Sequence, residues 1–107
     1  MTAESGTVGK LQSLIRLYRE GYRSPVIDQA VRKLIAVEVE QTKAELQRLE
    51  ARLSAYEQQH GMTSEEFYRR FRAGELGYDI DLVEWSAFWD MHQAARRRLD
   101  ELSEQAA

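Results

Sequence analysis

Apolar residues recur every three or four positions between Ser24 and Gly61, the longest periodic stretch of the chain. This spacing predicts one helix, with Ser24 as its N-cap, Pro25 at its first position and Gly61 at its C-terminal end. A helix of roughly 35 residues is about 50 Å long, which exceeds the diameter of a domain this small. We therefore expect a second long helix to cover its stripe. The repeating positions are Val31, Ile35, Val39, Thr42, Leu46, Leu49, Leu53 and Tyr56, of which only Thr42 is a polar interruption.

The two halves of this helix differ in their polarity. The half from Glu40 to Gln59 is charged outside one narrow seam, whose steps of four and three are typical of a coiled coil. The half from Ile27 to Val39 is apolar on more than one side. The first helix of the chain and a further partner are expected to cover this apolar half.

Three shorter helices are predicted around the long one. The first runs from about Val8 to Glu20 and ends at Gly21. A capping box of Thr63 and Glu66 starts a second, which runs to about Ala73. Asp79 or Asp81 caps the last helix, which continues to about Ser103. The stripe of this last helix consists of Leu82, Trp85, Phe88, Trp89, His92, Ala95, Leu99 and Leu102.

These elements predict an all-α fold. A short N-terminal helix precedes one long helix, which forms an antiparallel coiled-coil-like hairpin with the C-terminal helix, and a short helix lies in the connecting turn. The domain boundaries follow from the same pattern. Residues 1–9 are expected to be a flexible N-terminus, 10–39 a helical dimerisation region, and 40–107 a helical hairpin that binds a partner.

Composition narrows the functional classes. The 107 residues carry a net charge of −3 and no cysteine, which excludes a disulfide framework, a thiol nucleophile and a Cys-ligated metal. A global basic field for nucleic acid or an anionic membrane is also missing. The first ten residues lack the pattern of a signal peptide, and no stretch approaches about 20 apolar residues. A cytoplasmic protein without a membrane partner is expected.

Candidate catalytic groups are few. His60 is interpreted as a capping or surface residue near a helix end, and His92 as a partly buried core residue without a triad around it. A metal site built on Asp81 and Glu84 would need further ligands. Phosphate-cradling and nucleophile-elbow motifs are missing. We therefore predict no enzyme, no catalytic or metal site, and no cofactor.

Exposed aromatic residues beside arginines are typical anchors of protein interfaces. Trp85 and Phe88 are interpreted as core, whereas other aromatics near the predicted turn are expected to be partly exposed. The run Arg96–Arg98 is interpreted as a solvated face, with phosphate binding as the minor alternative. The predicted partner-binding residues are Tyr68, Arg69, Arg72, Tyr78 and Trp89. The predicted dimerisation residues are Leu14, Tyr18, Ile27, Val31, Leu34 and Ile35.

Two segments resemble known proteins. Residues 14–34, LIRLYREGYRSPVIDQAVRKL, resemble the helical part of bacterial ParD-like, ribbon-helix-helix antitoxins. In that family a DNA-reading strand precedes the first helix, whereas residues 1–8 here have no alternating basic strand pattern. The resemblance makes operator DNA an alternative partner, but the sequence does not indicate the strand that would read the DNA.

Residues 61–77, GMTSEEFYRRFRAGELG, followed by Trp85, resemble a motif of small helical bacterial and archaeal proteins found beside small toxins. Together the two resemblances imply an antitoxin-like bacterial protein of a type II toxin–antitoxin system. Such a protein, a homodimer or higher oligomer, would bind its cognate toxin, a ribonuclease, and mask the active cleft. The alternative is a self-assembling coiled-coil structural protein without a toxin partner.

Overall fold

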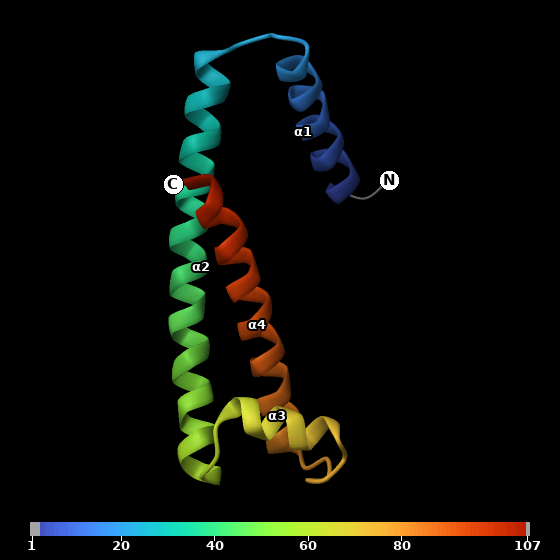
Figure 1. The fold of residues 1–107 in the computed structure, drawn as a ribbon, viewed down its shortest axis with the longest axis vertical. Helices are drawn as coiled ribbons and strands as arrows, with labels where there is room; N and C mark the ends of the chain where they lie inside the picture. Colours follow the sequence, from blue (N-terminus) through green and yellow to red (C-terminus); the bar gives the residue numbers. More distant parts are fainter. Residues whose placement is uncertain (1–2, 107) are drawn as a thin grey trace. The chain divides into compact units, whose positions relative to one another are not determined.

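Four helices make up the protein in the computed structural model, which describes the backbone of residues 3–106 (Figure 1). They are α1 (Ala3–Arg19), α2 (Pro25–His60), α3 (Ser64–Arg72) and α4 (Ile80–Ala106). Across this described range the fold is all-α, and α2 and α4 form the helical hairpin that the sequence predicts.

The chain divides into two compact units, residues 1–32 and residues 33–107. We call residues 1–32 the N-terminal unit, which holds α1 and the first turns of α2. We call residues 33–107 the hairpin unit, which holds the rest of α2 with α3 and α4.

In the N-terminal unit, α1 begins at Ala3, five residues before the predicted start at Val8. No proline interrupts residues 3–9, so the helix extends through most of the stretch for which we predicted a flexible start. Residues 1 and 2 of that stretch lie outside the described residues. At the other end, Ser24 caps α2 as predicted, because its hydroxyl accepts the backbone N–H of Ile27 at 3.3 Å.

The hairpin unit is held by the predicted seam of α2. Thr42, Leu46, Leu49 and Leu53 are buried. Leu46 and Leu49 pack against Ala95 of α4, with Phe88 and Leu99 beside them. The small side chain of Ala95 lets α4 approach α2 closely at this point. The two helices therefore run side by side, as Figure 1 shows.

The closed end of the hairpin is an aromatic core. Trp85 is fully buried and stacks on Phe67 of α3, with ring centroids 3.7 Å apart, and its indole N–H donates to the buried hydroxyl of Ser64 at 2.9 Å. Thr63 caps α3 as predicted, accepting the N–H of Glu66 at 3.1 Å. Gly61 adopts φ 67°, the left-handed conformation that ends α2 and allows the turn into α3.

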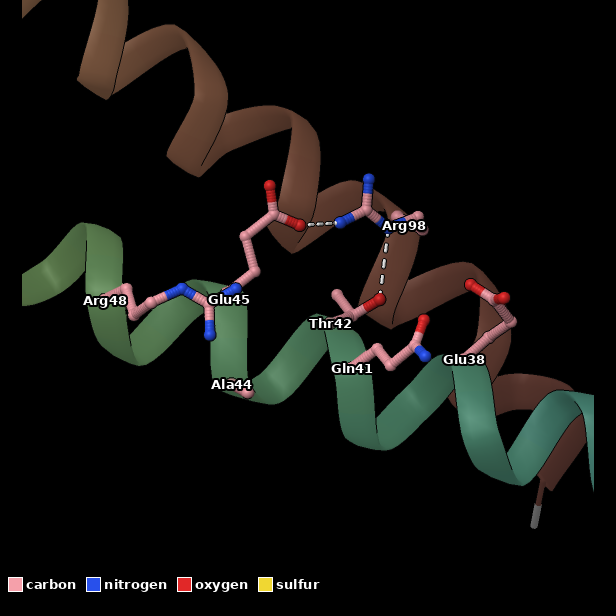
Figure 2. Close-up of a pocket in the computed structure, with 7 residues that line it drawn as sticks. All are labelled: Glu38, Gln41, Thr42, Ala44, Glu45, Arg48 and Arg98. Carbon is pink, nitrogen blue, oxygen red and sulfur yellow. Dashed lines mark hydrogen bonds and ion pairs between the residues drawn. The ribbon is translucent and has the colours of Figure 1, made fainter.

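Arg98 ties the two long helices together at the other end of the seam. Its Nε–H donates to Thr42 Oγ1 at 3.1 Å, and its terminal nitrogen pairs with Glu45 (Figure 2). Because Thr42 is buried and shielded from water, the hydroxyl of Thr42 depends on Arg98 as its hydrogen-bond donor. Arg96, Arg97 and Arg98 are all exposed, as predicted for a solvated face, but Arg98 also reaches across to α2, a contact that the sequence interpretation did not include.

Replacing Arg98 by Ala is expected to lower the free energy of unfolding by about 1 kcal/mol more than replacing Arg97 by Ala. The exposed part of its ion pair contributes little, but the buried hydroxyl of Thr42 loses a donor. Urea unfolding followed by circular dichroism measures the difference. Arg97 lies in the same basic run and is exposed, so the control removes the same side chain from the same helix. Equal effects of the two substitutions would contradict the role of Arg98.

Candidate protein-interaction surfaces

An open apolar groove lies between α1 and the first turns of α2, within the N-terminal unit. We call it the N-terminal groove. It encloses about 690 Å³. Four of the six predicted dimerisation residues line it: Leu14, Tyr18, Ile27 and Val31. The other lining residues lie within the predicted dimerisation region 10–39 but are not among its six named residues; they are Leu11, Ile15, Arg19, Asp28 and Arg32.

The remaining two predicted dimerisation residues, Leu34 and Ile35, belong to the hairpin unit and do not line this groove. Leu34 is 62% exposed, and Ile35 is half-buried. Nine large apolar side chains are exposed between Val8 and Val37, whereas exposed apolar residues on a soluble protein are usually scattered singly. They are Val8, Leu11, Ile15, Leu17, Tyr22, Val26, Val31, Leu34 and Val37.

The polar groups of the N-terminal groove leave it with a cationic rim. The hydroxyl of Tyr18 donates to the carboxylate of Asp28 at 2.6 Å, and this hydrogen bond raises the pKa of Tyr18 above its ordinary value. Asp28 therefore lines the groove as a carboxylate that accepts a neutral hydroxyl, and the exposed guanidinium groups of Arg19 and Arg32 outnumber it two to one. A ligand of this groove would need apolar side chains and a negative flank.

A second, more polar groove lies on the hairpin unit beside α3. It encloses about 380 Å³ and is lined by Tyr68, Arg69 and Trp89, together with Thr63, Glu65 and Glu66. The rings of Tyr68 and Trp89 lie 6.3 Å apart. Arg72 adds its guanidinium over the Tyr68 ring, 5.9 Å from the centroid. Four of the five predicted partner-binding residues therefore gather at one place, which we call the α3 groove.

Internal hydrogen bonds already engage part of the α3 groove. Arg69 binds the carboxylate of Glu66 at 2.6 Å, and this pairing holds the pKa of Glu66 below its ordinary value. A hydrogen bond to Asp90 raises the pKa of Tyr68. The groove is therefore preorganised, and the rings are held in place by their neighbours.

The fifth predicted residue, Tyr78, has a different position. It is 74% exposed, and its ring meets the edge of Phe71, with centroids 5.6 Å apart. Tyr78 lies in the turn between α3 and α4, outside the lining of the α3 groove. It presents most of an aromatic ring to solvent.

The two histidines differ from each other in their surroundings. His60 stacks on Trp85, with ring centroids 5.2 Å apart, and its Nε2 is buried without a hydrogen-bond partner. The interpretation of His60 as a capping or surface residue is therefore wrong, because the aromatic core draws its ring inward. His92 lies in the stripe of α4 beside Trp89 and Glu50, as a partly buried residue.

Sequence reasoning missed an exposed apolar face of α4. Ile80 is 71% exposed, and Val83, Ala87 and Met91 follow it at steps of three, four and four along the same side of the helix. We call these four residues the outer face of α4. Its signal in the sequence is this spacing of three and four, which forms a second apolar stripe beside the one predicted for α4; five carboxylates and no lysine or arginine lie between Arg72 and Arg96.

In the described part of the chain, no cluster of three or more histidine or carboxylate side chains could hold a metal ion. None of the helices over residues 3–106 is long and apolar enough to cross a bilayer.

Comparison with known proteins adds no relative. No protein-family model, no curated protein and no solved structure matches this chain. A function can therefore be inferred only from the surfaces described above.

Proposed function

We propose that this protein is an antitoxin-like binding protein without enzymatic activity. Its hairpin unit would bind a small toxin, a ribonuclease, and cover the active cleft, while two copies pair through the N-terminal unit. The observation that carries the proposal is that the hairpin unit presents two candidate contacts, the preorganised α3 groove and the exposed aromatic ring of Tyr78 in the turn between α3 and α4.

Charge supports a basic partner for the hairpin unit. Residues 33–107 carry fifteen acidic and ten basic side chains, whereas residues 1–32 carry three acidic and five basic ones. An RNA-cleaving toxin needs a cationic cleft for the phosphate backbone. The negative charge of the hairpin unit as a whole would speed encounter with such a cleft, whereas the α3 groove itself balances Glu65 and Glu66 with Arg69 and Arg72.

The test of this proposal is co-expression with the product of the neighbouring gene. We expect the two proteins to purify together and the chain to relieve the growth arrest that its neighbour causes. Tyr78→Ala should weaken the complex by roughly thirtyfold or more, the effect of losing one interface hot spot. Titration of the purified proteins by calorimetry measures this ratio.

Tyr22→Ala is the matched control. Tyr22 is an exposed tyrosine of the N-terminal unit, so the same truncation there should leave toxin binding within twofold. A neighbouring protein that neither binds nor harms growth would overturn the proposal. Equal losses of toxin affinity in Tyr22→Ala and Tyr78→Ala would contradict a binding site confined to the hairpin unit.

A self-assembling coiled-coil scaffold is the second candidate function. The observation that favours it is the run of exposed apolar side chains from Val8 to Val37, which a second copy could cover without any other protein. Sedimentation of the chain alone separates the candidates. A scaffold should form large assemblies that bury Tyr68 and Trp89, whereas the proposed neutraliser should stop at a small oligomer with both residues accessible.

A further inference from the structure

We infer that a second copy of this chain fills the N-terminal groove with the outer face of its own α4. The inference rests on the proposed pairing of two copies and names the surface that does the pairing. Two such contacts, one in each direction, would close a symmetric dimer.

The two surfaces match in apolar character, and the outer face of α4 is longer than the wall of α1 against which it would lie. The groove offers Leu11, Leu14 and Ile15 on one wall and Ile27 and Val31 on the other. The outer face of α4 spans eleven residue steps from Ile80 to Met91, about 16 Å, and the wall of α1 from Leu11 to Arg19 spans about 12 Å. A helix lying in a groove between two helices is a common mode of recognition.

The charges decide which surface occupies the groove. Arg19 and Arg32 line it with a single carboxylate, Asp28, so a second N-terminal groove placed face to face would bring two surfaces of net positive charge together. The outer face of α4 has the opposite sign: Asp79, Glu84 and Asp90 flank it, all exposed. A second outer face would in turn repel this one. Groove against outer face is the pairing in which both the apolar and the charged parts complement each other.

This arrangement also leaves the α3 groove open. Trp89 belongs to a different side of α4 from Val83 and Met91, and it contacts Tyr68 and His92 instead. Val83 and Met91 can therefore be altered without changing the α3 groove, while Asp90, which bonds Tyr68, and Tyr78, which directly precedes Asp79, lie beside the outer face.

Complementation between two variants tests the inference. Ile15→Glu places a carboxylate in the groove and leaves the outer face intact. Val83→Lys places a cation on the outer face and leaves the groove intact. Both residues are nearly half exposed, and both substitutions suit a helix, so folding should be preserved. Circular dichroism checks helix content, and Val83→Ser with Ile15→Ser serves as a milder pair should either variant misfold.

We expect each variant alone to dissociate at least tenfold more readily than the unaltered protein in analytical ultracentrifugation. An equal mixture should regain dimers, because one intact groove can bind one intact outer face. Arg97→Ala, outside both surfaces, should pair normally. Dimers of Val83→Lys alone as stable as those of the unaltered protein would overturn the inference, since grooves would then pair with each other. Unaffected dimers of Ile15→Glu alone would exclude the groove.

The failures of the two proposals are distinguishable. A chain that stays monomeric at every concentration refutes the pairing of two copies. A chain whose outer face fills its own groove would also stay monomeric, so that case refutes the pairing as well. A dimer whose variants do not complement each other refutes only this inference. Toxin binding measured with Val83→Lys reports separately on the neutralising function, because the α3 groove and Tyr78 are unaltered in it.

Discussion

Trp85→Ala is expected to destabilise the hairpin unit by about 3–5 kcal/mol, the largest effect of any single truncation proposed for this protein. Trp85 is fully buried and is stacked against Phe67, Tyr56 and His60, which come from both α2 and α3. Removing the indole leaves a cavity where three helices meet. It also leaves the buried hydroxyl of Ser64 without its donor.

Urea unfolding followed by circular dichroism at 222 nm measures this loss. Trp85→Phe serves as the graded control: the ring that replaces the indole still fills part of the space, but Ser64 loses the indole N–H. We therefore expect a smaller cost of roughly 1–3 kcal/mol. An alanine variant as stable as the phenylalanine variant would show that this aromatic core contributes little to the hairpin.

Leu49→Ala is expected to cost about 2–5 kcal/mol of unfolding free energy, whereas Leu34→Ala should cost less than about 0.5 kcal/mol in the monomer. The two substitutions are identical and lie in the same helix, so helix propensity cancels between them. Leu49 is 5% exposed against Ala95, and Leu34 is mostly exposed. The difference isolates the energy of the seam between α2 and α4.

This comparison must be made by chemical denaturation at protein concentrations low enough for the monomer to dominate. A larger effect of Leu34→Ala that appears only at high concentration would place Leu34 in an interface between copies, as the sequence predicts for it. Similar costs at both positions in the monomer would contradict the burial pattern of α2.

Much of the fold could be predicted because its signals are local. The N-cap at Ser24, the left-handed glycine at Gly61 and the cap at Thr63 each depend on a few neighbouring residues, and the structure has all three. The seam of α2 follows from its spacing of three and four, and the structure buries it against α4. The start of α1 was the poorest boundary, because small residues without proline neither require nor prevent a helix.

The candidate surfaces could be predicted only in part, because they depend on which residues the tertiary structure brings together as well as on helical spacing. Tyr68, Arg69, Arg72 and Trp89 were predicted as one group from their residue types, and the structure does gather them around the α3 groove, whereas Tyr78 lies apart against Phe71. Their role in binding remains a prediction. His60 was misplaced because its sequence position at a helix end says nothing of the aromatic ring that comes to lie beside it 25 residues later.

By itself, the sequence determined most helix boundaries and the seam of α2, since capping and periodicity are properties of neighbouring residues, but not the start of α1 or the outer face of α4. Only the tertiary structure decided which apolar faces are covered. It buries Leu49 and leaves Leu34 and Ile80 in solvent, although all three are equally apolar. It also sends Arg98 across to Thr42 while Arg97 stays outside. The reason is geometric, because one partner helix can cover only one side of another.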